Sequence, residues 1–222
     1  RAGSPLILGV GTDNSEFFLA SDAMALAGVT DQIVYLEEGD SVDLQPGRYW
    51  IAGKDGQMLQ TEQRPVKTVH AHSGAAELGP YRHYMQKEIH EQPKAVADTL
   101  HSVIKNGAID FSEVGLTDEE MRETSQIVIA ACGSAWHVGM AAQYVIEDMT
   151  GIPVRVELAS EFRYRKPPLD KNALVIVISQ SGETLDTMAA MREAKRRGAR
   201  TLAIVNVVGS SIAREADDVL YT

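Results

Sequence analysis

The chain has 222 residues, of which 44% are hydrophobic and 23% are charged, a composition typical of a globular protein with a buried core. Its formal net charge of -10 argues against sequence-independent binding of nucleic acid, which requires a basic surface. Cys132 is the single cysteine, which excludes an intrachain disulfide, and no run of about 18 apolar residues predicts a membrane-spanning helix.

Residues 1–62 have the pattern of short β-strands separated by turns. The apolar runs PLILGVG, EFFLASD and QIVYLEEGD follow one another closely, and SDAMALAG predicts a short helix at residues 21–28. RYWIAGKDGQMLQTE predicts a hairpin with its turn at Asp55-Gly56. Because no long helix separates these strands, we expect an antiparallel, β-rich N-terminal part.

The segment 64–80 contains two prolines and two glycines, and we interpret it as a linker. We place the domain boundary near residue 72, which divides the chain into residues 1–72 and 73–222. His70 and His72 lie in this linker, where a solvated pair is a simpler interpretation than a chelating pair. We therefore expect no metal site.

From Tyr84 onward the pattern changes to alternating helices and strands. The stretch 84–104 has apolar residues at helical spacing, and we expect Pro93 to kink or restart this helix. The alternation that follows predicts a three-layer α/β/α domain with a parallel sheet covered on both faces. The expected strands are 127–131, 154–156, 174–178, 201–205 and 218–221, and the expected helices are 135–149 and 184–197, with short ones near Ser160 and Ser210.

Three loops that join a strand to a helix are rich in glycine and serine: CGSA at 132–135, SQSGET at 179–184 and NVVGSS at 206–211. The carboxyl ends of parallel strands meet at one edge of a sheet, where ligands bind in open α/β folds. Free N–H groups at helix starts, together with glycine and hydroxyl groups, favour an anion there. Neither a Walker loop nor a G-x-G-x-x-G fingerprint is present, so the loops predict a small phosphorylated ligand rather than a nucleotide.

A simpler interpretation is that these serines and threonines are ordinary helix caps. One such loop is more often a cap than a site, whereas three loops at one sheet edge favour a site. We expect Glu183 to interact with the helix dipole in the first helical turn rather than to act as a base. Cys132 follows a buried strand, where a cysteine usually behaves as a small hydrophobic residue.

SQSGET after a buried strand, with ACGSA before it and NVVGSSIARE after it, resembles the sugar isomerase (SIS) domains, which bind phosphosugars. YRHYMQKEIHEQP, VELASEFRYR and LEEGD narrow the resemblance to the isomerising glutamine:fructose-6-phosphate aminotransferases. RAGSPLILGVG and FFLASD then resemble the end of that family's glutaminase domain, which has an Ntn-hydrolase fold. The resemblance implies the C-terminal part of a glutaminase domain in residues 1–72 and a first SIS subdomain, incomplete at its C-terminus, in residues 73–222.

Members of this family form glucosamine 6-phosphate and glutamate from fructose 6-phosphate and glutamine, the first step of hexosamine biosynthesis. The resemblance therefore implies fructose 6-phosphate and glucosamine 6-phosphate as ligands, and L-glutamine as a substrate of the full-length enzyme. It further implies a homodimer. We also expect a cytoplasmic protein without a cofactor, and the charge and the lack of a long apolar run predict binding to neither nucleic acid nor membranes.

The resemblance also assigns site residues. Ser181 and Thr184 are expected to face phosphate oxygens, with Ser179 and Gln180 beside them. Ser134 matches a threonine of the family's CGTS loop, which contacts the sugar, whereas Ala135 replaces the usual serine and removes one hydroxyl. Cys132 is expected, at most, to line a path for ammonia. The family's catalytic residues are expected outside residues 1–222, so the chain by itself should be inactive.

Two other functions remain open from the sequence. One is a non-catalytic SIS-domain regulator that binds a phosphosugar, and the other is an aldose–ketose phosphate isomerase. Residues 1–62 argue against both, because such regulators more often carry a helical DNA-binding domain and a simple isomerase does not need a glutaminase segment.

Overall fold

The structure is a computed structural model that describes residues 1–69, 77–112 and 114–222. The described residues form two compact units, Arg1–Glu91 and Gln92–Thr222, each with its own hydrophobic core. The predicted domain boundary near residue 72 lies outside the described residues, as do His70 and His72.

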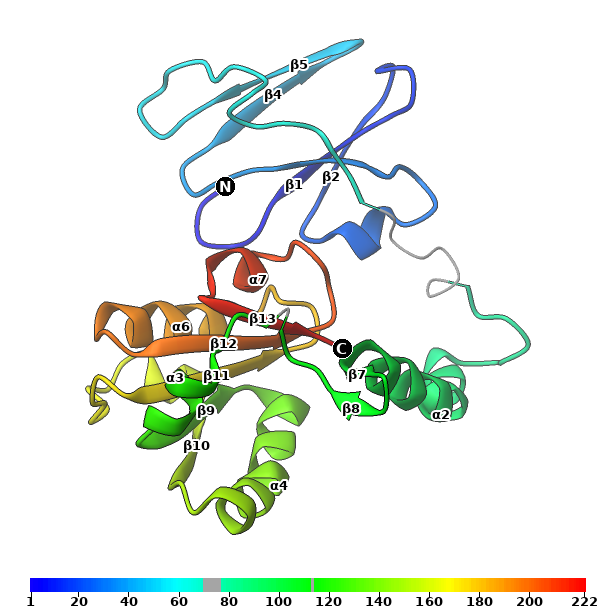
Figure 1. The fold of residues 1–222 in the computed structure, drawn as a ribbon. Coiled ribbons are helices and arrows are strands. Elements are labelled where there is room, and N and C mark those ends of the chain that lie inside the picture. Colours follow the sequence, from blue (N-terminus) through cyan, green and yellow to red (C-terminus); the bar gives the residue numbers. More distant parts are fainter. Residues whose placement is uncertain (70–76, 113) are drawn as a thin grey trace. The chain divides into compact units, whose positions relative to one another are not determined.

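The first unit is built on antiparallel strands, as its sequence predicts (Figure 1). Four strands form one sheet in the order β2-β1-β3-β6: β1 (Ile7–Val10), β2 (Phe17–Ala20), β3 (Gln32–Tyr35) and β6 (Lys67–Thr68). Strand β1 is buried on both faces, so that Ile7 packs with Leu26 while Leu8 packs with Val34 and Leu36 on the other side. The 3₁₀-helix η1 (Ala23–Leu26) confirms the short helix expected at 21–28.

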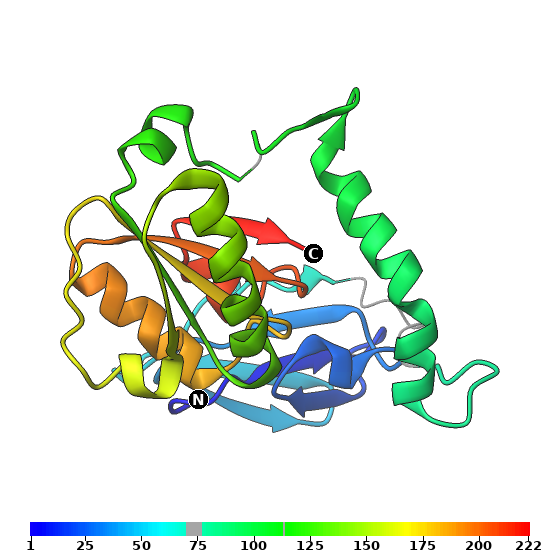
Figure 2. The ribbon, with the colours of Figure 1, turned by 90° about the horizontal axis from the view of Figure 1, so that it is seen from below.

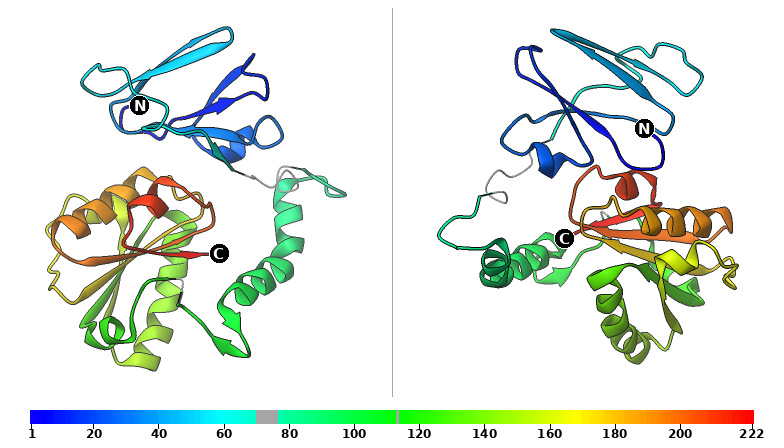
Figure 3. Two further views of the ribbon diagram at one scale, coloured as in Figure 1. Left: turned by 45° about the horizontal axis from the view of Figure 1, so that its top comes forward. Right: turned by 180° about the vertical axis from the view of Figure 1, so that it is seen from behind.

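A second antiparallel pair in this unit, β4 (Ser41–Gln45) and β5 (Arg48–Ala52), differs from the prediction (Figure 3). Its strands are joined through Gly47, which has a φ of 78°. The expected turn at Asp55-Gly56 does form, and the chain after it returns to β5 through an antiparallel bridge between Ala52 and Met58 and a hydrogen bond from the Leu59 N–H to the Ile51 carbonyl at 2.8 Å, but it is too short to form a strand. Met58 is 55% exposed, whereas Leu59 packs against the core cluster that includes Ile51.

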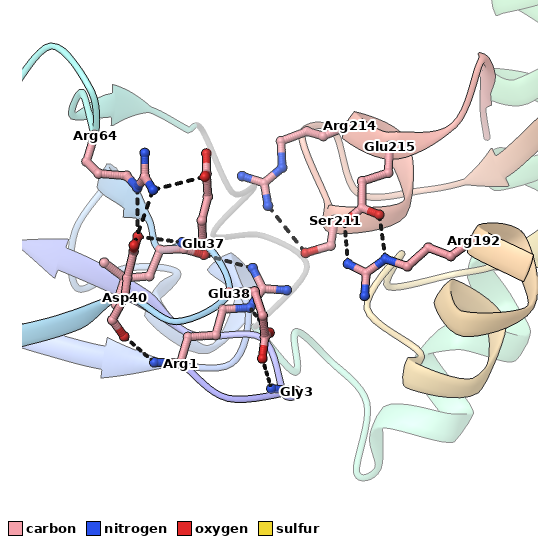
Figure 4. Close-up of polar contacts among 11 residues, drawn as sticks. Arg1, Gly3, Glu37, Glu38, Asp40, Arg64, Arg192, Ser211, Arg214 and Glu215 are labelled. Atoms are coloured by element: carbon pink, nitrogen blue, oxygen red, sulfur yellow. Dashed lines mark hydrogen bonds and ion pairs between the residues drawn. The ribbon is translucent and has the colours of Figure 1, made fainter. Parts of the chain in front are cut away.

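A buried ion pair fixes the loop after β3 (Figure 4). The Asp40 carboxylate is 2% exposed and accepts hydrogen bonds from Arg64 Nε and from the Glu37 N–H, both at 2.7 Å. Burial by itself raises the pKa of Asp40, but the hydrogen bonds from Arg64 and Glu37 and the Arg64 charge outweigh it and lower the pKa. The ionised carboxylate is therefore the form that stabilises this loop.

Helix α2 (Tyr84–Val103) is one continuous helix (Figure 2), so Pro93 does not restart it. A proline inside a helix removes one backbone hydrogen bond, which the neighbouring turns can tolerate. Three short elements follow: β7 (Ile104–Lys105), β8 (Ala108–Ile109) and α3 (Asp118–Glu123). Helix α3 begins with a capping box between Thr117 and Glu120.

The second unit contains a five-stranded sheet in which every pairing is parallel, in the order β10-β9-β11-β12-β13. Its strands are β9 (Gln126–Ala131), β10 (Val154–Leu158), β11 (Ala173–Ser179), β12 (Arg200–Val205) and β13 (Asp218–Tyr221). Each begins and ends within two residues of its prediction. The expected α/β domain with a parallel sheet is therefore confirmed.

Helices cover both faces of this sheet (Figure 1). Helix α4 (Gly133–Thr150) lies on one face, and α5 (Ala159–Phe162), α6 (Leu185–Arg196) and α7 (Ser211–Glu215) lie on the other. Along β9, Ile129 packs in the cluster that includes Ala142 of α4, whereas Val128 packs in the cluster that includes Met188 of α6. No helix in the described residues is both long and apolar enough to span a membrane.

Candidate functional site

The order of the strands defines a switch point between β9 and β11. From β9 the chain moves outward to β10, then returns to β11 on the other side of β9 and continues to β12 and β13. In open α/β sheets, ligands bind beyond the carboxyl ends of the strands at such a point. The loops 132–135 and 179–184 follow β9 and β11, and thus flank it.

The strand register brings the starts of the three glycine- and serine-rich loops level with one another. Ala131 pairs with Ile178, and Ser179 pairs with Val205, so β9, β11 and β12 end side by side. The Asn206 N–H then donates to the Gln180 carbonyl at 3.2 Å, which continues this pairing beyond β11 and β12. The structure therefore brings the three predicted loops to one edge of the sheet.

Loop 179–184 is held by hydrogen bonds among its own residues. Ser179 is 3% exposed, and its Oγ accepts from the Gly182 N–H at 3.1 Å and lies 2.9 Å from Thr184 Oγ1. Ser181 is half-buried, and its Oγ accepts from the Glu183 N–H at 3.2 Å. Gln180 is exposed. Of the predicted site residues, the buried Ser179 thus stabilises the conformation of the loop. Gln180, Ser181 and Thr184 keep part of their side chains exposed to solvent.

Two longer helices begin at this edge without a side-chain cap. Thr184 is the N-cap of α6 and Cys132 is the N-cap of α4, and neither side chain accepts a hydrogen bond from its own helix. The first N–H groups of a helix have no partner within it, and the helix dipole is positive there. Two helix starts on neighbouring strands therefore provide N–H donors and positive potential for an anion.

In the loop after β9, one predicted residue is exposed and another is half-buried. Gly133 has a φ of 59°, a conformation that favours glycine, and Ser134 is exposed in the first turn of α4. Cys132 is half-buried and packs against the core cluster that includes Val128. Ser134 can therefore reach a ligand at this edge, whereas Cys132 is partly a core residue.

The third loop, 206–211, packs directly against loop 179–184. The Ile212 N–H donates to the Gly182 carbonyl at 3.0 Å, and the Ser211 N–H donates to Glu183 Oε1 at 2.8 Å. Gly182 has a φ of 64°, and a Cβ added to it would lie 2.0 Å from Ser210 Oγ. Loops 179–184 and 206–211 thus form one packed structure.

These contacts were not predicted. The sequence suggested that Glu183 interacts with the helix that follows it, but its carboxylate binds the start of α7, 28 residues further on. The sequence pattern carries no signal for this pairing, because the distance along the chain has no relation to helical or strand periodicity. It depends on β11 and β12 ending side by side.

A cavity of 580 Å³ in the second unit lies at the opposite edge of the sheet, where Ala173 begins β11 and Arg200 begins β12. None of the three loops lines it. Of the three cationic residues that line it, Lys195 and Arg200 pair with Asp217 and Asp218, at 2.7 Å and 2.6 Å, and the third is Lys171. Within the described parts of the chain, no group of three or more His, Cys, Asp or Glu side chains could hold a metal ion.

Comparison with protein families and curated proteins identifies relatives. The profile of the SIS domain family matches residues 120–222, which include β9 to β13 and the three loops. Over 218 residues, the chain is 50% identical to a glutamine--fructose-6-phosphate aminotransferase [isomerizing] of Bordetella pertussis, covering 98% of this chain and 35% of the relative. A protein of the same name from Symbiobacterium thermophilum is 48% identical over 224 residues, covering 100% of this chain and 36% of the relative. The chain thus spans 35–36% of the length of these curated relatives.

Solved structures agree with this relationship. The C-terminal domain of glucosamine-fructose-6-phosphate aminotransferase from Francisella tularensis superposes with a TM-score of 0.62 and 39% identity, over 66% of this chain and 42% of that chain. A putative phosphosugar isomerase from Silicibacter pomeroyi DSS-3 has a TM-score of 0.51 and 30% identity, over 62% of this chain and 41% of that chain. Residues 120–222 are therefore a SIS domain, and the chain is homologous to a segment of the isomerising glutamine–fructose-6-phosphate aminotransferases.

Proposed function

We propose that the protein carrying this chain forms glucosamine 6-phosphate and glutamate from fructose 6-phosphate and glutamine, and that loop 179–184 binds the sugar phosphate. The main support is the pair of uncapped helix starts at the switch point between β9 and β11. The identity of 50% to an enzyme of this name, over nearly the whole chain, supports the reaction.

The chemistry of loop 179–184 suits a phosphate dianion. The start of α6 supplies backbone N–H groups, and the hydroxyls of Ser181 and Thr184 supply donors that rotate to meet phosphate oxygens. Hydrogen bonds to a charged acceptor contribute about 1.5–3 kcal/mol each, so a few of them are enough for millimolar to micromolar binding. Gln180 adds an exposed amide beside them.

The loop after β9 is in a position to contact the sugar. Ser134 lies at the start of α4, directly after β9, which is the strand next to β11. Its hydroxyl would therefore contact the hexose while loop 179–184 binds the phosphate. Ala135 contributes no hydroxyl there. Cys132, the half-buried first residue of this loop, would at most line a path for ammonia.

Proton transfer is not a task that these loops can perform. They carry hydroxyls, amides, backbone N–H groups and the half-buried Cys132 thiol, and the one carboxylate, Glu183, is bonded to the start of α7. We therefore assign binding and orientation of the sugar phosphate to this segment. The groups that open and isomerise the sugar would come from other parts of the full-length enzyme.

The first unit would be the last part of a glutaminase domain with an Ntn-hydrolase fold. Its antiparallel sheet fits such a domain, and the aminotransferase relatives cover these residues. L-glutamine would then be the nitrogen donor, and the enzyme would act as a cytoplasmic homodimer.

A phosphosugar isomerase is the second candidate, since a putative isomerase shares 30% identity with this chain. Both candidates bind a hexose phosphate, but only the aminotransferase consumes glutamine. The similarity of residues 1–69 to the aminotransferases favours the first candidate.

The test uses the full-length gene product with fructose 6-phosphate and glutamine labelled with ¹⁵N in its amide group. We expect ¹⁵N-labelled glucosamine 6-phosphate and glutamate in equal amounts. Conversion of fructose 6-phosphate to an aldose phosphate with no loss of glutamine would identify an isomerase instead. Binding of fructose 6-phosphate but not fructose to the 222-residue chain, measured by calorimetry, would support the phosphate site separately.

A further inference from the structure

Glu183 presents an electrostatic problem if the neighbouring loop holds a phosphate. A carboxylate close to a dianion repels it, by about 2 kcal/mol at 4 Å even in water and by more where water is excluded. The sequence nevertheless places this acid between Gly182 and Thr184, in the middle of the loop. Glu183 must therefore have a role that offsets this repulsion, and the contacts of its carboxylate indicate that role.

The Glu183 carboxylate connects two loops. Its Oε1 accepts from the Ser211 N–H at 2.8 Å, at the start of α7, where a negative charge is stabilised. The backbone N–H of Glu183 donates to Ser181 Oγ at 3.2 Å. One residue therefore links the backbone of α7 to the hydroxyl that is expected to face the phosphate.

Two further contacts make this link rigid. The Ile212 N–H donates to the Gly182 carbonyl at 3.0 Å, and Ser210, which is 2% exposed, packs against the Cα of Gly182. The side chain of Glu183 thus completes a connection that the backbone and the packing begin. Loss of the carboxylate would leave the Ser211 N–H, on a buried residue, without this acceptor.

We propose that Glu183 is a positioning residue, which holds loop 179–184 in its anion-binding conformation by binding the start of α7, and that it is not the base of the reaction. The inference rests on the proposed phosphate site. It predicts that the hydrogen-bond acceptor of Glu183 is needed while its negative charge is not. The charge should even weaken phosphate binding, because it lies beside the site.

Two substitutions separate the acceptor from the charge. Glu183→Gln keeps an oxygen that can accept from the Ser211 N–H, and we expect it to bind fructose 6-phosphate at least as tightly as the wild type. Glu183→Ala removes the acceptor, and we expect affinity to fall about ten-fold or more. In the full-length enzyme, Glu183→Ala should raise KM, while Glu183→Gln should retain kcat.

Asp186 provides a matched control. It is an acid in the first turn of the same helix, α6, and it pairs with Arg163 at 2.6 Å instead of with α7. Asp186→Asn removes one negative charge near the loop without changing the contact to Ser211. We expect its affinity to stay within about two-fold of the wild type, as for a surface charge.

Amide hydrogen exchange tests the connection without any ligand. Exchange at Ser211 should be faster in Glu183→Ala and unchanged in Glu183→Gln. Wild-type affinity in Glu183→Ala, or loss of kcat with binding retained in Glu183→Gln, would overturn the inference. Failure of the wild type to bind fructose 6-phosphate would instead overturn the proposed function, whatever the exchange rates show.

Discussion

The serine hydroxyls of loop 179–184 have different surroundings, although they belong to one short motif. Ser179 is buried and bonded within the loop, so its removal would disturb the loop itself. Ser181 is half-buried and accepts only from the Glu183 N–H among the hydrogen bonds of the described residues, which leaves its own proton available to a ligand. The clearest test of the phosphate site is therefore at Ser181.

Ser181→Ala is expected to weaken binding of fructose 6-phosphate by about 1.5–3 kcal/mol, the usual range for a hydrogen bond to a charged group. Calorimetric titration measures the change. Ser102→Ala is a suitable control, because the exposed Ser102 Oγ donates to the carbonyl of Thr99 in its own helix. Identical titration curves for Ser181→Ala and the wild type would count against this phosphate site.

Gly182 is required for two separate reasons, its φ of 64° and its contact with Ser210. Gly182→Ala should destabilise the protein by about 2–4 kcal/mol, from backbone strain and overpacking together. Gly198→Ala separates the two effects, since Gly198 has a φ of 80° but no atom within 4 Å of an added Cβ. We expect Gly198→Ala to cost about 1 kcal/mol, from backbone strain alone. Equal losses in urea denaturation would show that the contact with Ser210 has no effect.

At the scale of elements, the loop after β3 depends on the ionised form of Asp40. Its pKa is lowered in the folded protein, so the stability it contributes is present above its unfolded pKa of about 3.9. This stability is lost as the pH falls through the lower, folded pKa. Removing Arg64 leaves the buried carboxylate without its cation.

Arg64→Ala should therefore destabilise the protein by about 3–5 kcal/mol at pH 7. The difference from the wild type should shrink as the pH falls below about 4, because protonation of Asp40 removes the charge that Arg64 pairs with. Chemical denaturation at several pH values measures both. A difference that is the same at pH 7 and pH 3 would show that the ion pair is not responsible.

At the scale of the whole molecule, the net charge of -10 limits the possible partners. A uniformly charged polyanion is repelled by such a protein, whereas a small phosphate ester can be held by local N–H and hydroxyl donors. We therefore expect no mobility shift of duplex DNA by the chain at physiological salt, with a basic DNA-binding protein as positive control. Binding of DNA at micromolar concentrations would favour the alternative of a phosphosugar-dependent regulator.

The accuracy of the sequence predictions depended on how local each signal is. Strands such as Leu174–Ile178 are continuous apolar runs that only a sheet covered on both faces can bury, so they were found to within two residues. The RYWIA run that forms β5 is predicted as a strand, but its partner β4 is not, because β4 has no buried residue and the turn at Pro46-Gly47 is a weaker signal than Asp55-Gly56. Which run pairs with β5 depends on the burial of side chains in the folded unit, which the local sequence does not show.

The sequence by itself determined the alternation of strands and helices, the parallel sheet and the three loops at its carboxyl edge, because periodicity and glycine–serine composition are local properties. The tertiary structure decided which side chains in those loops serve the loop and which remain available to a ligand. It also decided that Gly182 and Glu183 bind the start of α7. These contacts join residues about 30 positions apart, and they exist only because two strands end side by side in the folded sheet.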